Sequence, residues 1–251
     1  MRSVFEEKEE GRDASLLRRI SYAIAPLGVL AFWCCMVISA RRYPSGYDWR
    51  YLSVSKLVYP ERNPAGYLWA VAGIVLCSTC GLYWVHGLAR RRNHAGTGYR
   101  PRGTRALQMG YLFMLCAVLP DWLLRIEKAH EILAALAFAG LLIGMVRLMF
   151  QTSENILLSR IRRPRSQARA YAFIVASVAV LPIVLAGLAQ AYFYYVPEKF
   201  RWGGFSWSVQ GWPVLLRFPF WEWITCIVLS VYMAGLSLAT HGGQQTRKSG
   251  E

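Results

Sequence analysis

Acidic residues and histidines are scarce in this sequence. Of its 251 residues, 14 are Asp or Glu and four are His, against 29 Lys and Arg. Charged residues make up 17% of the chain, which is less than a soluble domain of this length usually carries. The middles of the long apolar stretches contain no charged residue and no histidine. Proton relays and ion pumps need ionisable groups at that depth, so the sequence disfavours both functions.

Common catalytic motifs are also missing. The chain contains neither the glycine-rich P-loop that cradles phosphates nor the G-x-S-x-G turn of many hydrolases. His130 and Glu131 begin like the zinc motif H-E-x-x-H, but Ala134 occupies the position of the second histidine. A zinc site of that kind is therefore not predicted, and no motif indicates a cofactor.

Six apolar stretches account for most of the chain, and each is long enough to cross a membrane. A helix needs roughly 20 residues to cross the hydrocarbon core, and lipid offers its backbone no hydrogen-bonding partner. We therefore predict an all-α, polytopic membrane protein, a six-transmembrane-helix bundle. The predicted helices cover residues 21–40, 66–88, 106–124, 131–150, 170–194 and 220–240, within a transmembrane domain of residues 20–240. Residues 1–19 form a charged N-terminal tail and residues 241–251 a C-terminal tail.

The basic residues indicate an orientation. Most of them fall in residues 1–19, 89–105, 147–169 and 241–251, at alternate ends of the predicted helices. Such residues are retained in the cytoplasm, so both termini are predicted to be cytoplasmic. The first apolar stretch is longer than that of a signal peptide, so we expect an uncleaved helix. The net charge of +15 then reflects topology and attraction to anionic lipids in a plasma or inner membrane, and not nucleic-acid binding.

Small residues inside the apolar stretches are expected to serve packing. All six cysteines lie there, including Cys77 and Cys80 with their C-x-x-C spacing, and packing is favoured over a metal or redox role. Gly140 and Gly144 lie one turn apart and would let another helix approach closely. We favour a helix of the same chain as that neighbour over a second copy.

Polar residues from distant segments fall at one predicted depth, the outer end of the bundle. The candidates for binding a lipid or another ligand are Asp121, His130, Glu131, Glu222, Ser53, Ser55, Asn63 and Gln190. In one interpretation these groups act locally, because Asp121 can pair with Arg125 and because acids favour the first turn of a helix. In the other, Asp121, Glu131 and Glu222 line a polar pocket with His130, where neighbouring carboxylates favour a shared proton or a metal ion.

Aromatic residues are concentrated on the same predicted side. Five tryptophans follow the fifth predicted helix or open the sixth: Trp202, Trp207, Trp212, Trp221 and Trp223. Tryptophan prefers the membrane interface, where its ring is apolar and its N–H stays hydrated. Anchoring at the interface is therefore favoured over the stacking of a ligand.

Two stretches carry a resemblance to a known family. They are YDWRYLSVSKLVYPERNPAGYLW (Tyr47 to Trp69) and FPFWEWI (Phe218 to Ile224), the second with an acid framed by aromatics at the start of the last helix. With six helices and both ends inside, the chain resembles the FRAG/DRAM/SFK-type family and its uncharacterised prokaryotic relatives. The resemblance implies a role in lipid handling, membrane organisation or autophagy-like regulation, and it implies no reaction.

Three functions stay open on the sequence alone. The first is a non-enzymatic membrane protein that binds a lipid headgroup or organises lipids at the outer rim. The second is a metal-dependent, membrane-embedded lipid hydrolase using Asp121, His130, Glu131 and Glu222, although such enzymes usually supply several histidines on one face. The third is an accessory subunit that contacts another membrane protein through its aromatic outer loop and Gly140 and Gly144.

Overall fold

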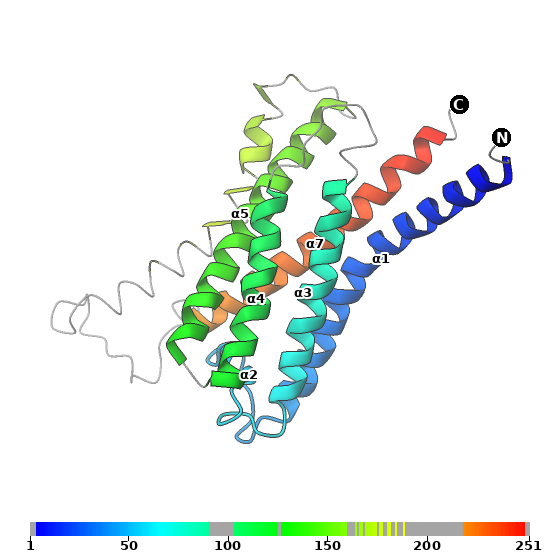
Figure 1. Cartoon of the computed structure of the whole chain (residues 1–251). Helices are drawn as coiled ribbons and strands as arrows, with labels where there is room; N and C mark the ends of the chain where they lie inside the picture. Colours follow the sequence, from blue (N-terminus) through cyan, green and yellow to red (C-terminus); the bar gives the residue numbers. More distant parts are fainter. Residues whose placement is uncertain are drawn as a thin grey trace. The chain divides into compact units, whose positions relative to one another are not determined.

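The computed structural model describes residues 4–90, 103–124, 127–159, 218–248 and scattered positions between 164 and 188, and most of these residues are helical. The helices bounded there are α1 (Val4–Arg41), α2 (Ser55–Val58), α3 (Tyr67–Arg90), α4 (Thr104–Leu124), α5 (Glu127–Ser159) and α7 (Phe218–Lys248) (Figure 1). No β-strand occurs within these ranges, and the predicted all-α class is confirmed for them.

Four helices contain a segment that is long and apolar enough to cross a membrane. These segments are Ala23–Arg41 in α1, Tyr67–Ala89 in α3, Ala129–Glu154 in α5 and Phe218–Ser237 in α7. They coincide with four of the predicted spans and are compatible with an integral membrane protein. The predicted span 106–124 is helical as α4 but is not among the four, and the span 170–194 lies largely outside the described residues. Six crossings and cytoplasmic termini therefore remain predictions.

The helices extend further than the apolar stretches do. α1 begins at Val4, so residues of the charged N-terminal tail are helical, and α7 continues to Lys248 in the C-terminal tail. α5 begins at Glu127, four residues before the predicted start at 131. Hydropathy marks only the part of a helix that lies in hydrocarbon, whereas Ala, Leu, Glu, Lys and Arg continue a helix into water. The helices predicted from the apolar stretches are therefore shorter than the helices in the structure.

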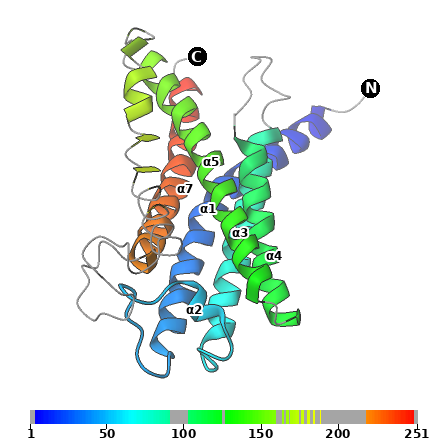
Figure 2. The ribbon, with the colours of Figure 1, turned by 90° about the vertical axis from the view of Figure 1, so that its left-hand side faces the viewer.

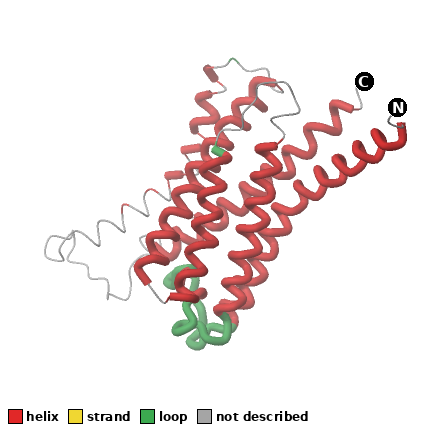
Figure 3. Tube along the Cα trace, in the orientation of Figure 1, coloured by secondary structure: helices red, strands yellow, loops and turns green. Residues whose placement is uncertain are grey.

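The chain forms two units by its internal packing. The first comprises Met1–Cys35, Val71–Met145 and Ser230–Glu251. The second comprises Met36–Ala70 and Val146–Leu229. The long helices α1, α3, α5 and α7 each contribute to both units. The second unit also contains residues 42–66, which connect α1 to α3 and are named the α1–α3 segment below (Figure 3).

In the first unit, α4 packs against α5 through glycines, and the two helices run side by side (Figures 1 and 2). A Cβ atom added to Gly140 would lie 2.8 Å from the Cα atom of Gly110. One added to Gly144 would lie 2.7 Å from the backbone nitrogen of Leu107. Because the two backbones touch at these points, the prediction that Gly140 and Gly144 serve packing within the chain is confirmed.

A glycine also sets the contact between α1 and α3 in this unit. A Cβ atom on Gly28 would lie 2.5 Å from that of Cys80 and 3.6 Å from the Cα atom of Cys77. Both cysteines are free thiols. The C-x-x-C pair therefore lies where two helices meet, as expected for small packing residues.

Candidate functional site

The α1–α3 segment is a folded structure and not an extended connection. Its first turn closes with a hydrogen bond from the Gly46 N–H to the Tyr43 carbonyl (3.1 Å), and Gly46 adopts a φ of 76°, which glycine allows without strain. The short helix α2 follows, with Leu57 and Val58 buried. Burial of these apolar side chains fixes the segment against the rest of its unit.

Glu222 joins this segment to the first turn of α7. Its carboxylate oxygen Oε2 accepts a hydrogen bond from the backbone N–H of Val54 at 2.9 Å, although the two residues are 168 positions apart in the sequence. Both are nearly buried, with 9% of Glu222 and 8% of Val54 exposed. A hydrogen bond in such surroundings is stronger than one in water, because water does not compete for it.

The next residue of α7, Trp223, makes a second connection. Its indole N–H lies 3.0 Å from both the Tyr47 hydroxyl oxygen and the Leu52 carbonyl oxygen, and its ring meets the Tyr47 ring edge to face at 5.9 Å. The Tyr47 hydroxyl in turn has its one proton within reach of two carbonyl oxygens, those of Leu52 (2.8 Å) and Ser53 (2.9 Å). Glu222 and Trp223 therefore hold the same stretch of backbone, residues 52–54.

Tyr47 remains protonated in this arrangement. Burial raises the pKa of its hydroxyl well above the ordinary value, and the charge of Glu222 acts in the same direction. The indole N–H of Trp223 acts in the opposite direction, with a smaller effect than burial. A protonated hydroxyl can accept from the indole while its single proton is shared between the two carbonyl oxygens.

Three further predicted site residues are polar contacts of the segment. Ser53 and Ser55 hydrogen-bond to each other through their hydroxyls at 2.8 Å. Asn63 is fully buried, and its Nδ2 donates to the Ser39 hydroxyl at 2.9 Å and lies 3.3 Å from the carbonyls of Ser39 and Leu57. Asn63 therefore links the end of α1 to α2.

The exposed face of the segment combines cations with aromatic rings. The guanidinium carbon of Arg42 lies 5.6 Å from the ring centre of Trp69, and both side chains are exposed. Arg50 lies 5.5 Å from the Tyr51 ring in the same way. These distances are those of cation–π contacts.

Two further contacts lie on the exposed face of the α1–α3 segment. Trp49, which is 43% exposed, stacks on Phe220 of α7 with ring centres 5.6 Å apart. Arg50 forms an ion pair with Asp48 at 2.7 Å, and its hydrogen bonds lower the pKa of that carboxyl group. The charge of Arg50 is therefore partly compensated within the segment, whereas the Arg42 side chain lies on an aromatic ring.

The predicted residues of the α4–α5 corner belong to the first unit. His130 is buried, and its Nδ1 lies 2.9 Å from the Ala117 carbonyl oxygen of α4. Since a carbonyl only accepts, Nδ1 carries the proton in this contact, which ties the start of α5 to α4. Glu131 is exposed. Asp121 is part of α4, but its side chain lies outside the described residues.

Other predicted residues lie outside the described part of the chain. These are Gln190 and the tryptophans Trp202, Trp207 and Trp212. Trp221 is part of α7 and makes an edge-to-face contact with Phe220 at 5.3 Å. Within the described residues, no three His, Cys, Asp or Glu side chains lie close enough together to hold a metal ion.

The sequence did not indicate the contact partners of Glu222 and Trp223 in the α1–α3 segment. The Val54 N–H carries no signal, because every residue except proline has such a group. Tyr47 belongs to an aromatic-rich stretch, but nothing in its spacing indicates Trp223, which lies 176 residues later. The pairing of Arg42 with Trp69 could have been suspected, since both flank the predicted membrane boundary.

Comparison with known proteins gives no match: no family model fits the chain, and no curated protein or solved structure is significantly similar to it.

Proposed function

We propose that this chain is an integral membrane protein whose α1–α3 segment binds the headgroup of an anionic membrane lipid at the predicted outer surface of a plasma or inner membrane. The observation that carries the proposal is the exposed face of this segment, where Arg42 lies over the Trp69 ring at 5.6 Å. Aromatic rings favour the depth of the headgroups, and arginine there attracts anionic lipid.

The charge of the segment supports an anionic ligand. Between residues 42 and 66 the sequence contains Arg42, Arg50, Lys56 and Arg62, against Asp48 and Glu61. A guanidinium group offers a lipid phosphate two parallel N–H donors, which makes arginine well suited to this ligand.

One acid predicted for the site, Glu222, supports this function indirectly. The Oε2 atom of Glu222 accepts the Val54 N–H, and Trp223 holds the adjacent carbonyl of Leu52. Fixing residues 52–54 restricts the neighbouring Arg50 and Tyr51 before a ligand arrives. Such preorganisation lowers the entropy cost of binding.

The test uses the full chain in nanodiscs made from equal parts of phosphatidylglycerol and phosphatidylcholine. Native mass spectrometry measures how much of each lipid stays bound after release into the gas phase. We expect Arg42→Gln to weaken retention of phosphatidylglycerol about fivefold, which corresponds to the roughly 1 kcal/mol that one basic residue contributes near an anionic surface.

The matched control is Arg147→Gln, because Arg147 is an exposed arginine of α5 and its loss changes the net charge equally. Retention of phosphatidylcholine should be the same in all three proteins. If Arg42→Gln and Arg147→Gln lose phosphatidylglycerol to the same extent, the α1–α3 segment has no preference for it, and the proposal is wrong.

A relation to the FRAG/DRAM/SFK-type family remains part of the proposal. The two stretches that carry the resemblance, Tyr47 to Trp69 and Phe218 to Ile224, contact each other in the second unit, which supports it. The contacts are the hydrogen bonds of Trp223 with Tyr47 and of Glu222 with the Val54 N–H. Neither a metal-dependent hydrolase nor an accessory subunit is favoured by a specific contact among the described residues.

A further inference from the structure

A groove between α3 and α4 lies in the first unit, separate from the α1–α3 segment. It has a volume of about 580 Å³, within the roughly 300–1,000 Å³ that ligand sites usually have. Its polar lining residues are His86, Arg105 and Gln108, and its apolar ones are Leu82, Tyr83, Met109 and Leu112.

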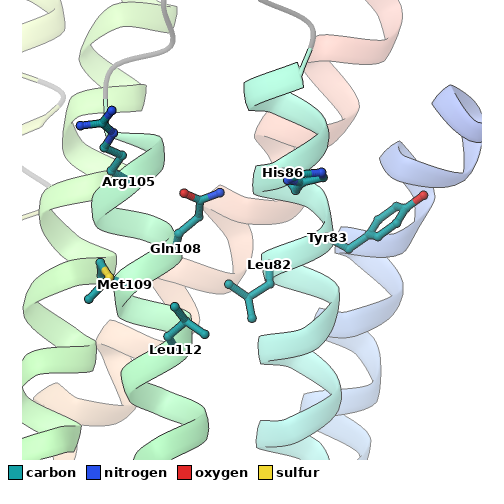
Figure 4. Close-up of a pocket in the computed structure, with 7 residues that line it drawn as sticks. All are labelled: Leu82, Tyr83, His86, Arg105, Gln108, Met109 and Leu112. Carbon is teal, nitrogen blue, oxygen red and sulfur yellow. The ribbon is translucent and has the colours of Figure 1, made fainter.

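Polar and apolar side chains are sorted along this groove (Figure 4). Arg105 and His86 lie at its upper end, Gln108 below Arg105, and Leu112 at the lower end. Arg105 and Leu112 are seven residues apart on α4, which corresponds to about 10 Å along a helix. The upper end lies near the end of the candidate span Tyr67–Ala89, because His86 is three residues before Ala89.

We propose that this groove binds an anionic glycerophospholipid, with the phosphate against Arg105 and an acyl chain along Met109 and Leu112. The charges are complementary, since Arg105 is an exposed cation, and the amide of Gln108 adds a donor for phosphate oxygens. Basic pockets between membrane helices bind anionic headgroups for this reason.

The size of the groove favours a lipid chain over a helix of a partner protein. A helix with side chains is about 10 Å across, so it would fill 580 Å³ within about 7 Å of its length, little more than one turn. An acyl chain is thinner and can follow the groove past Met109, which is 47% exposed, and Leu112, which is 44% exposed. The proposal concerns a different unit from the headgroup site on the α1–α3 segment and does not depend on it.

The test again uses the full chain, now titrated in mild detergent with phosphatidylglycerol and followed by native mass spectrometry. Arg105→Gln should weaken binding of this lipid about fivefold, whereas Arg147→Gln, the same substitution on an exposed site of α5, should not. Met109→Trp should also weaken binding, because the larger side chain fills the apolar part and leaves every charge in place.

Two comparisons separate the possible ligands. Glycerol phosphate, which has the headgroup chemistry without the chains, should compete poorly. If it competes as well as the lipid and Met109→Trp has no effect, the groove is a site for free phosphate, and the proposal is overturned. It is equally overturned if phosphatidylcholine binds as tightly as phosphatidylglycerol to the wild type and to Arg105→Gln. Should Arg105→Gln fail to fold, Met109→Trp and Gln108→Leu decide the question.

Both proposed sites take phosphatidylglycerol, so the groove variants are compared in the Arg42→Gln background as well as in the wild type. Because Arg42→Gln leaves the groove intact, Arg105→Gln and Met109→Trp should weaken binding by the same factor in both backgrounds. The headgroup site can therefore fail its own test while the groove passes, and the reverse also holds.

Discussion

Replacing Glu222 with leucine tests whether this acid holds the α1–α3 segment in place. Leucine has a similar volume but no acceptor, so the Val54 N–H, which now donates to Oε2 at 2.9 Å, would be left buried without its partner. Glutamine at the same position has a carbonyl oxygen in place of Oε2 and keeps the acceptor. The two variants therefore differ in the hydrogen bond, while neither has an ionisable group at this position.

The expected size of the effect follows from the lost bond. A buried donor left without an acceptor costs about 1–3 kcal/mol. Since about 1.4 kcal/mol corresponds to a factor of ten, opening of the segment around Val54 should become about five- to 150-fold more frequent in Glu222→Leu. Global stability is a poor measure here, because leucine also makes the α7 span more apolar and so favours its insertion.

Hydrogen exchange followed by mass spectrometry gives the local measurement. The peptide covering residues 50–58 should exchange faster in Glu222→Leu by the factor above, and in Glu222→Gln by much less. Peptides from α4, which belongs to the first unit, serve as an internal control. Equal exchange in wild type and Glu222→Leu, or equal acceleration in both variants, would refute the role assigned to this hydrogen bond.

Gly110→Ala should lower the free energy of unfolding by about 1–3 kcal/mol, because its Cβ atom would lie 2.6 Å from the Leu141 backbone nitrogen. Gly235→Ala is the control, because a Cβ atom there would meet nothing within 4 Å. Thermal unfolding in detergent compares the two variants, and equal melting temperatures would contradict the proposed packing of α4 against α5. Tyr47→Phe and Trp223→Phe should each destabilise the protein. Because the two side chains share a hydrogen bond of 3.0 Å, the double-mutant cycle should give a coupling energy of about 0.5–1.5 kcal/mol. Strictly additive effects would show that this hydrogen bond contributes nothing to stability.

The fold class was largely predictable from the sequence, because one physical constraint governs it. A backbone in hydrocarbon must satisfy its own hydrogen bonds, so four of the predicted stretches appear as helices of membrane-spanning length. The helix ends were predicted less well. Val4 and Lys248 lie beyond the apolar stretches, where helix propensity and local contacts decide and hydropathy gives no signal.

Four of the predicted site residues make contacts in the α1–α3 segment or with it, but the sequence did not indicate their partners. Glu222, Asn63 and the two serines were selected because they come from distant segments but fall at one predicted depth, the outer end of the bundle. Their partners could not be selected, because several are backbone atoms: the Val54 N–H for Glu222 and the Leu57 carbonyl for Asn63. Such pairings follow from the path of the chain in three dimensions, which no short motif encodes.

The bond between Glu222 and Val54 also separates the two ways in which a headgroup could use this site. A cationic headgroup that binds the carboxylate competes with the Val54 N–H at Oε2 and should release the segment, so exchange of residues 50–58 would rise with lipid concentration. An anionic headgroup that binds Arg42 leaves this bond intact and, by binding the folded segment, should slow the same exchange. The direction of the change therefore tells whether the buried acid is itself the binding group or, as proposed, the residue that keeps the binding surface in shape.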